Sequence, residues 1–263
     1  MKFTRLLFIM GASLAAAVGC SEEVSLDFHK EGNCWQMSQA QFDKFAKKLS
    51  KASPEEADAL IDRVYTIADS LSAAEQDGTF LVFADAMEHT FYQVDSPLRN
   101  DDLYLRVLDR ESRCNSLMST DYRRIDWKEH ILRANAVGSE VVDLPVSDIN
   151  GEETSLHRLL DEQTVLLVYG EDCKACTKLM NEAVNSSKFK KAAEDGQLRL
   201  LSLYIGEDGE EFAAKSAVLK DWANFIDARQ LVRYENAFDS RLVPSLYLIS
   251  DKKMVKVKGT LSV

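Results

Sequence analysis

The stretch TVLLVYGEDCKACTKLMNE (residues 164–182) gives the most specific indication of the fold in this sequence. Its first seven residues form a continuous β-rich apolar run, which is typical of a central strand covered on both faces. Leu179 and Met180 then begin a helical pattern. Cys173 and Cys176 stand between the two elements, so the sequence predicts a Cys-X-X-Cys pair at the carboxyl end of a strand.

This location gives the two cysteines different chemistry. A thiol at the start of a helix meets free backbone N–H groups and the positive end of the helix dipole, which favour its thiolate. We therefore expect Cys173 to attack and Cys176, one turn later, to resolve. Lys174 should support the thiolate, whereas Glu171 and Asp172 should oppose it. The direction of exchange, whether reduction, oxidation or isomerisation, stays open.

Two other interpretations of the pair are a metal half-site and a static structural disulfide. A structural zinc site needs four ligands, typically with a second pair at similar spacing. The remaining cysteines are isolated, and the histidines are scattered singly: His29, His89, His130 and His157. A pair at the mouth of a strand is also poorly placed to staple the fold. We predict no metal and no cofactor beyond the two thiols.

Around this stretch, residues 137–263 predict an α/β layer. Residues 137–160 indicate a strand, an Asn150-Gly151 turn and a short helix from Leu156. QLRLLSLYIG (residues 197–206) is a second buried-strand candidate. Residues 210–226 look helical, with candidate inner-face residues Phe212, Leu219, Trp222 and Ile226. The segments VPSLYLIS and MVKVKG then indicate a closing antiparallel pair.

The chain before this layer divides into three segments. Residues 1–19 combine Lys2, Arg5, an apolar stretch and small residues, which describes a signal peptide. The apolar stretch is short for a membrane span, which needs roughly 20 apolar residues. Residues 20–35 are expected to be a tether. Residues 36–135 show helical periodicity, and the SPEE segment at 53–56 has the pattern of a capping box.

The remaining cysteines have separate roles. The segment Ala17-Val18-Gly19-Cys20 resembles the lipobox of bacterial lipoproteins, in which the cysteine is lipidated. The alternative is a secreted protein with a cysteine near its cleavage site. Cys34 and Cys114 either form a structural disulfide or are two buried free thiols. The protein is predicted to lie in the bacterial cell envelope, anchored by a lipid at the outer membrane. The sequence does not distinguish between the periplasmic face and the surface face of that membrane.

Charge narrows the choice of partners. The formal net charge is −11, and removing residues 1–19 takes away two positive charges and leaves −13. Nucleic acid and anionic lipid both require a basic face, so neither is expected to bind the protein surface. The expected partners are protein thiols or disulfides and an upstream envelope redox protein, with the membrane reached through the N-terminal lipid.

Three segments in this order resemble the thioredoxin-like thiol-disulfide oxidoreductases of the cell envelope. Residues 137–160 resemble the entry segment of the cytochrome-maturation-type branch, VLLVYGEDCKAC its active-site strand and helix, and LVPSLYLI the strand that opens with a cis-proline. The resemblance implies that Val243 and Pro244 lie beside the cysteine pair and dock substrate. The whole chain is similar to Bacteroidetes lipoproteins whose N-terminal domain has no assigned function. Asp172 departs from the family, which usually has tryptophan there.

The sequence therefore predicts a thioredoxin-like α/β C-terminal domain behind a mainly α-helical N-terminal domain of unknown function. The predicted activity is disulfide exchange with protein substrates through Cys173 and Cys176. The competing hypothesis is a surface-anchored interaction protein in which the thioredoxin-like unit is a scaffold without catalysis, since a fold does not by itself dictate function.

Overall fold

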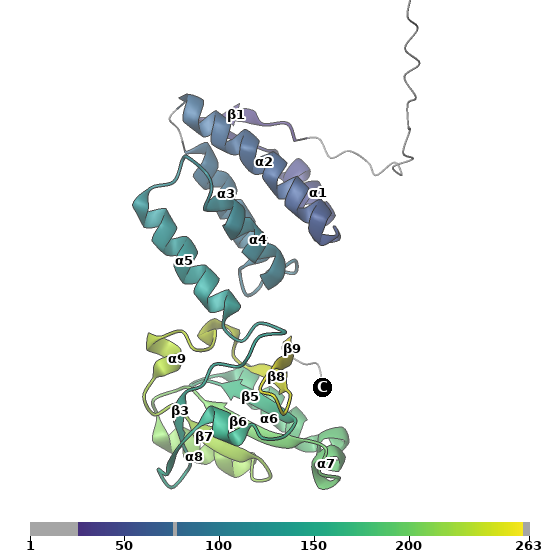
Figure 1. The fold of residues 1–263 in the computed structure, drawn as a ribbon, viewed down its shortest axis with the longest axis vertical. Helices are drawn as coiled ribbons and strands as arrows, with labels where there is room; N and C mark the ends of the chain where they lie inside the picture. Colours follow the sequence, from purple (N-terminus) through teal and green to yellow (C-terminus); the bar gives the residue numbers. More distant parts are fainter. Residues whose placement is uncertain (1–25, 76–77, 260–263) are drawn as a thin grey trace, which may run out of the picture.

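The computed structural model describes residues 26–75 and 78–259, which form a helical region followed by a sheet domain (Figure 1). The helical region contains β1 (His29–Glu31), β2 (Cys34–Gln36), α1 (Gln39–Leu49), α2 (Pro54–Glu75), α3 (Thr79–Phe91), α4 (Asp101–Glu111) and α5 (Ser119–Arg133). The sheet domain begins with β3 (Pro145–Ser147), β4 (Glu153–Ser155), η1 (Leu156–Leu159), β5 (Thr164–Tyr169), α6 (Lys174–Asn185), α7 (Ser187–Glu194) and β6 (Arg199–Tyr204). It continues with α8 (Gly209–Val218), β7 (Ala223–Ile226), α9 (Leu231–Tyr234), η2 (Ser240–Leu242), β8 (Ser245–Ile249) and β9 (Val255–Gly259).

Capping residues set the helix starts of the helical region. The predicted capping box precedes α2: the Ser53 N–H donates to Glu56 and the Glu56 N–H donates to the Ser53 hydroxyl, with Pro54 in the first helical position. Asn100 caps α4 by accepting from the Leu103 N–H at 2.9 Å. Apolar residues at helical spacing then bury one core shared by the five helices, as the periodicity predicts.

A short hairpin corrects the expectation of a tether at residues 20–35. The strands β1 and β2 pair antiparallel, and β2 contacts α2 and α3. Leu26 and Phe28 pack against the helical core. Within the described residues, the chain therefore joins the folded region by Leu26. Each strand has only three residues, which is too short to show the alternation that marks a strand in sequence.

The sheet of the second domain has seven strands in the order β4-β3-β7-β6-β5-β8-β9. The predicted central strand β5 is fully buried and pairs parallel with β6 and antiparallel with β8. The strands β8 and β9 form the expected closing antiparallel pair, and β3 and β4 form the expected hairpin. The segment that carries Cys173 and Cys176 therefore follows a strand in the interior of the sheet.

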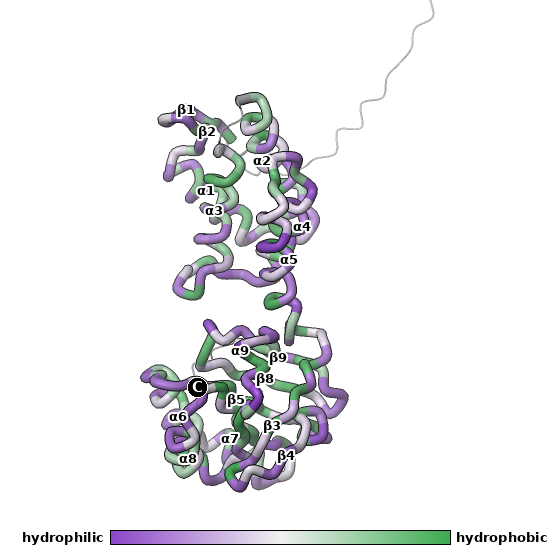
Figure 2. Tube along the Cα trace, turned by 90° about the vertical axis from the view of Figure 1, so that its left-hand side faces the viewer, coloured by the Kyte–Doolittle hydropathy of each residue, from purple (hydrophilic) through white to green (hydrophobic). Residues whose placement is uncertain are grey.

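Each face of the sheet carries its own core, because successive residues of a strand point to opposite faces. Val165, Leu167 and Tyr169 of β5 pack with α6, α8 and Trp222. Leu166 and Val168 pack on the other face with the segment around η1 and with residues near α9. Figure 2 shows hydrophobic residues gathered along these strands. The element that carries the cysteines therefore lies on a sheet covered on both sides.

The helix expected at residues 210–226 is wrong in its second half. The helix α8 ends at Val218, and Ala223–Ile226 forms β7, which pairs parallel with Leu201–Tyr204 of β6. Phe212, Leu219 and Trp222 are buried as expected, whereas Ile226 is half-buried in the sheet. Backbone pairing with β6 outweighs the helical spacing of these side chains. Among the described residues, no helix is long and apolar enough to cross a membrane.

Candidate active site

The strand β5 and the helix α6 place the two cysteines as the sequence predicts. Cys173 is the N-cap of α6, and its Sγ accepts a hydrogen bond from the Cys176 N–H at 3.0 Å. The two sulfurs form a disulfide with an S–S distance of 2.02 Å. Cys173 is half-buried, whereas Cys176 is fully buried among Leu179, Met180 and the strands. Only Cys173 of the pair is therefore open to an incoming group.

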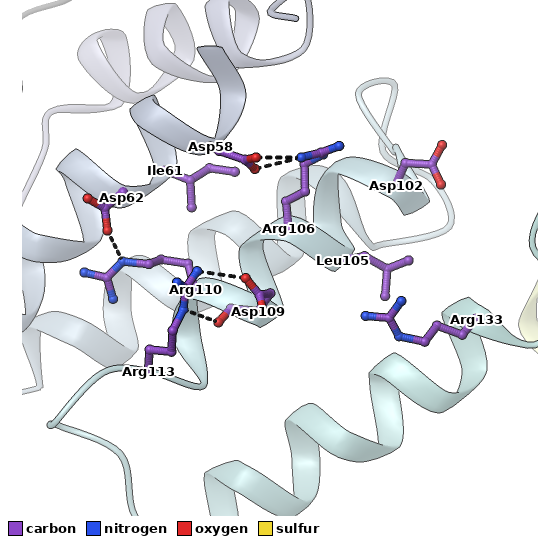
Figure 3. Close-up of a pocket in the computed structure, with 10 residues that line it drawn as sticks. All are labelled: Asp58, Ile61, Asp62, Asp102, Leu105, Arg106, Asp109, Arg110, Arg113 and Arg133. Carbon is purple, nitrogen blue, oxygen red and sulfur yellow. Dashed lines mark hydrogen bonds and ion pairs between the residues drawn. The ribbon is translucent and has the colours of Figure 1, made fainter. Parts of the chain in front are cut away.

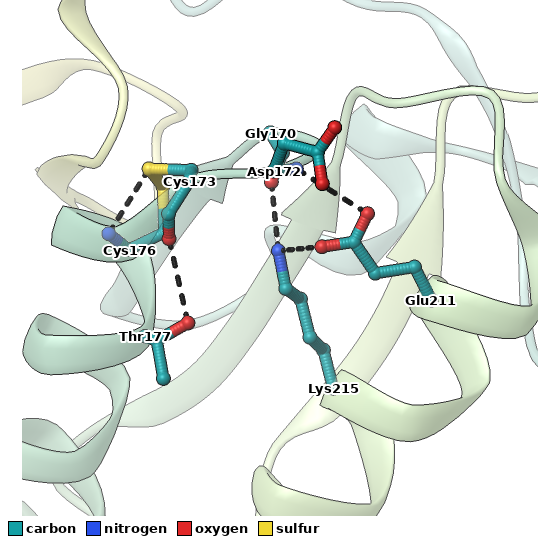
Figure 4. Close-up of a disulfide and its surroundings, with 7 residues drawn as sticks. All are labelled: Gly170, Asp172, Cys173, Cys176, Thr177, Glu211 and Lys215. Carbon is teal, nitrogen blue, oxygen red and sulfur yellow. Dashed lines mark hydrogen bonds and ion pairs between the residues drawn. A yellow bond between two sulfur atoms is a disulfide. The ribbon is translucent and has the colours of Figure 1, made fainter.

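A tight turn between β5 and α6 presents Cys173. Asp172, directly before it, has a φ of +49°, in the left-handed region that aspartate and asparagine tolerate better than most residues. The Lys215 ammonium donates to the Gly170 carbonyl at 2.9 Å, and the Asp172 N–H donates to Glu211 at 3.4 Å (Figure 4). Two side chains of α8 thus hold the backbone of the turn on both sides of Glu171.

Lys215 and Glu211 also hold each other. Their charged groups form an ion pair at 2.5 Å, and the Tyr204 hydroxyl donates to Glu211 at 3.1 Å. Burial acts to raise the pKa of Glu211, but the hydrogen bonds from Lys215 and Tyr204 and the charge of Lys215 lower it overall. Burial raises the pKa of the nearby Tyr169 to about 12. Glu211 is therefore a fixed anion beside the turn.

The surroundings of the turn are acidic. Carboxylate oxygens of Glu171, Asp208 and Glu211 lie within 4.8 Å of one another. Glu171 and Asp208 are exposed, and Glu211 is already bound by Lys215 and Tyr204, so this grouping gives no reason to infer a metal. Its negative charge acts against a Cys173 thiolate, in opposition to the helix dipole.

The proline loop lies beside the cysteines. The Val243-Pro244 peptide bond is cis, as the resemblance implied. Val243 packs in the same cluster as Cys173 and Cys176. A Cβ added at Gly170 would meet the Val243 side chain at 3.4 Å, so the cysteine turn and the proline loop are in direct contact. The structure thus brings together Cys173, Cys176, Val243 and Pro244.

The other predicted site residues lie elsewhere. Cys20 is outside the described residues. Cys34 and Cys114 are both free thiols, so the alternative of a structural disulfide is not formed. Cys34 faces Gly78 at the α2–α3 turn, whereas Cys114 accepts a hydrogen bond from Arg110 at 3.0 Å beside α2. Burial raises the pKa of Cys114 to about 11, which makes it an unreactive thiol.

A cavity of about 630 Å³ is lined entirely by residues of the helical region (Figure 3), and neither Cys173 nor Cys176 lines it. Three of its arginines pair with carboxylates that also line it: Arg106 with Asp58 at 2.8 Å, Arg110 with Asp62 at 2.6 Å, and Arg113 with Asp109 at 2.8 Å. These arginines already have carboxylate partners, so they give no reason to infer an anionic ligand. We therefore place the candidate active site at the disulfide.

The sequence did not reveal the Glu211–Lys215 pair. The i, i+4 spacing of the two residues is visible in the chain and predicts an ion pair on a helix. Their contact with Gly170 and Asp172 depends on how α8 packs against α6, which no local pattern specifies.

Comparisons with known proteins support the two-part organisation. Residues 30–135 match the model of a family described as a domain of unknown function, DUF5106. A search of curated proteins finds no match. A thioredoxin-like protein from Bacteroides caccae is similar in structure, with a TM-score of 0.73 and 20% identity, over 84% of this chain and 79% of that one. Because the similarity covers 84% of this chain, it includes the sheet domain and extends into the helical region.

Two further solved structures match about half of the chain. The C-terminal domain of an uncharacterised protein from Bacteroides fragilis has a TM-score of 0.46 and 24% identity, over 49% of this chain and 92% of that one. The thioredoxin domain of a thiol-disulfide oxidoreductase from Bacteroides vulgatus has a TM-score of 0.39 and 13% identity, over 48% of this chain and 89% of that one. The sheet domain has the thioredoxin-like fold, and a mainly helical region precedes it.

Proposed function

We propose that this protein, whose C-terminal domain has the thioredoxin-like fold, exchanges disulfides with protein substrates through Cys173 and Cys176. The observation that carries the proposal is the asymmetry of the pair. Cys173 caps α6 and is partly open to solvent, whereas Cys176 is fully buried behind it. A structural staple does not need one accessible sulfur at a helix N-terminus, but a nucleophile does.

The reductive half-reaction balances with the two thiols alone. The Cys173 thiolate attacks one sulfur of a substrate disulfide, so that a Cys173–substrate bond forms and the substrate S–S bond breaks. The departing substrate sulfur takes up a proton. The Cys176 thiolate then attacks the Cys173 sulfur, which releases the second substrate thiol and forms the Cys173–Cys176 disulfide. Two electrons pass from the protein dithiol to the substrate, and the oxidative direction is the reverse sequence.

Turnover in the reductive direction needs a donor of electrons. We propose that an upstream envelope dithiol protein restores the two thiols by the same exchange chemistry. Val243 and Pro244, in contact with the cysteine turn, are proposed to dock the extended substrate chain.

The proposed setting is the bacterial cell envelope, with the chain anchored through a lipid on Cys20. The support is the signal-like composition of residues 1–19 and the small residues before Cys20. Cys20→Ser is expected to lose lipid labelling and to leave the membrane fraction. A Cys20→Ser protein that remained labelled and membrane-bound would show the anchor proposal to be wrong.

The test of the exchange reaction is capture of its intermediate. Cys176→Ser expressed in the native envelope should accumulate covalent partners that a reductant releases, because the resolving thiol is gone. Cys173→Ser should trap few or none, since its remaining thiol is buried. Adding Cys34→Ser to Cys176→Ser is the control for accidental cross-linking and should leave the adducts unchanged. Equal trapping by the two single variants would contradict the roles given to the cysteines.

The competing function, an interaction protein with a non-catalytic thioredoxin-like scaffold, makes a different prediction. A structural disulfide in a secreted protein typically has a reduction potential below about −300 mV. A potential in that range for Cys173–Cys176, together with no trapped partner, would favour the scaffold. A higher potential with trapped partners supports exchange.

A further inference from the structure

A cavity of about 430 Å³ begins at the proline loop and reaches the helical region. Leu242, Val243 and Lys258 line it from the thioredoxin-like domain. Val94 and Asp101, near the α3–α4 connection, line the opposite side, and Val137 lines it from the segment after α5. We call this cavity the junction pocket. Because Val243 packs against the same cluster as Cys173 and lies beside Gly170, the pocket lies next to the turn that carries the disulfide.

Ion pairs across the junction hold its two walls together. Arg99 of the helical region pairs with Asp101 at 2.8 Å and reaches Asp239 of the other domain at 3.6 Å. Arg241 donates two hydrogen bonds to Asp239, each at 2.8 Å, and its guanidinium lies 4.2 Å from the centre of the Tyr92 ring. The walls are therefore fixed by contacts that link the two parts of the chain.

A further contact closes the same network. Lys258 of β9 lies 3.4 Å from Asp101, so each of the three cations at the junction faces a carboxylate. Asp102 also lines the pocket, so three carboxylates balance the three cations. What the pocket offers a ligand is therefore mainly apolar surface.

Two exposed apolar side chains face this pocket. Val94 is 47% exposed and Val137 is 63% exposed, and both line it. At the other wall, neither the N–H nor the C=O of Val243 makes a hydrogen bond within the described residues. A free backbone edge can pair with an extended chain, and neighbouring pockets then accept its side chains. The free edge and the apolar surface lie side by side.

We propose that the junction pocket receives an apolar side chain that flanks the reacting cysteine of an extended protein substrate. This inference rests on the exchange function proposed above and assigns the helical region a part in selecting the substrate. The pocket adjoins the cysteine site, and this position identifies the occupant. A chain that presents its sulfur to Cys173 and pairs with Val243 places its neighbouring side chains at the pocket. Val94 and Val137 are then specificity-determining residues outside the reacting centre.

The probes are three disulfides that differ only in what flanks the sulfur. The first is the symmetrical disulfide of the peptide Ala-Leu-Leu-Cys-Leu-Ala, and the second replaces each leucine by serine. The third is bis(2-hydroxyethyl) disulfide, which is too small to reach the pocket. Pre-reduced protein is mixed with each probe, and the reaction is quenched by alkylation. Mass spectrometry then measures the rate at which the protein is oxidised. The variants are Val94→Asp and Val137→Asp. Their matched control is Val82→Asp, a 40%-exposed valine of α3 outside the pocket.

The expected result is a preference of about tenfold for the leucine peptide, since burying part of one leucine side chain contributes on this scale. Val94→Asp and Val137→Asp should each remove most of that preference, whereas Val82→Asp should keep it. All variants should react equally with bis(2-hydroxyethyl) disulfide. Because both valines are exposed, circular dichroism should show unchanged folding.

Three results would overturn the proposal, and they can be told apart. No reaction with bis(2-hydroxyethyl) disulfide would remove the exchange function and this inference together. Normal reaction with that probe, but equal rates for the two peptides or no effect of the pocket variants, would remove only this inference. An effect of Val94→Asp that appeared only after residues 260–263 were deleted would assign the pocket to the chain's own C-terminal residues.

Discussion

In the helical region, Lys128 forms its ion pair with Glu88 inside the bundle, whereas in the thioredoxin-like domain Lys178 pairs with Glu182 on the outer surface of α6. The Lys128 side chain is 4% exposed and the Lys178 side chain 80%. Both are lysine–glutamate pairs within one domain. Their surroundings make the first a structural element of the core and the second an ordinary surface contact.

The two regions also differ in the ionisable groups that they bury. The helical region buries a lysine and a glutamate: Lys128 is 4% exposed, and Glu111, which is 1% exposed, accepts a hydrogen bond from Tyr65 at 2.5 Å. The thioredoxin-like domain buries two aspartates, Asp227 and Asp239, and places further carboxylates around the turn that carries Cys173. Charge should therefore act on folding stability in the helical region and on thiol reactivity in the other domain.

The largest expected effect tests the buried pair. Lys128→Met should lower the free energy of unfolding of the helical region by about 3 kcal/mol, because Glu88 loses its buried partner and keeps only the partly exposed Arg124 at 3.1 Å. Lys178→Met is the matched control and should cost less than about 0.5 kcal/mol. Hydrogen exchange read by mass spectrometry reports the two regions separately. Equal effects of the two variants would mean that burial does not make the Lys128–Glu88 pair more stabilising than the Lys178–Glu182 pair.

A second effect concerns the pH dependence of the helical region. Burial raises the pKa of Glu111 to about 7, and the hydrogen bond from Tyr65 opposes this only in part. An unfolded glutamate has a pKa of about 4.3, so between these values the unfolded chain binds fewer protons than the folded one. The contribution of Glu111 is therefore complete below about pH 4.3 and is lost as the pH rises through 7.

The measurement compares the protein with Glu111→Gln, which cannot titrate. Relative to that variant, the free energy of unfolding of the helical region should fall by about 2–3 kcal/mol between pH 4.5 and 7. Parallel pH profiles for the two proteins would mean that Glu111 is ionised in the fold already at low pH.

A smaller effect tests the turn before Cys173. Lys215→Met removes the hydrogen bond to the Gly170 carbonyl and the ion pair with Glu211. The rate of exchange should fall about tenfold, since a hydrogen bond from a charged group contributes on this scale. Lys215 is a positioning residue, so the reduction potential should shift as well, and Lys215→Arg should restore part of the rate. A loss of stability with an unchanged potential would give Lys215 a structural role only.

The smallest effect tests the charge beside the nucleophile. Asp172→Asn keeps the left-handed conformation available and removes one negative charge. The pKa of the Cys173 thiol should fall, raising the thiolate fraction about two- to threefold at low salt. The pH dependence of alkylation in the Cys176→Ser background measures it. Asp195→Asn, at the end of α7, should change nothing, and no difference between the two variants would contradict the electrostatic argument.

The residues of the reacting centre could be predicted from local sequence. The strand β5 is an unbroken apolar run, Cys173 follows it at a helix start, and Pro244 opens a recognisable strand. The contacts that link distant segments could not be predicted in the same way. Tyr65 meets Glu111 and Arg99 reaches Asp239 only because helices and domains pack together. The spacing of residues along the chain does not predict such long-range contacts.

Some short strands also could not be predicted from the sequence, for a different reason. The four residues of β7 continue a helical spacing, and only their pairing with β6 makes them a strand. The hairpin of β1 and β2 has three residues in each strand and is fixed by contacts with α2 and α3. In both cases the tertiary partner decides the structure.

The position of β5 between β6 and β8 also sets an order of assembly as the chain is made. The helical region ends with α5 at Arg133 and can fold from contacts between elements close in sequence. The central strand keeps an open edge until Ser245–Ile249 has emerged. Val243 and Pro244 arrive at the same moment. A nascent chain therefore holds both cysteines well before it holds the loop proposed to dock a substrate beside them.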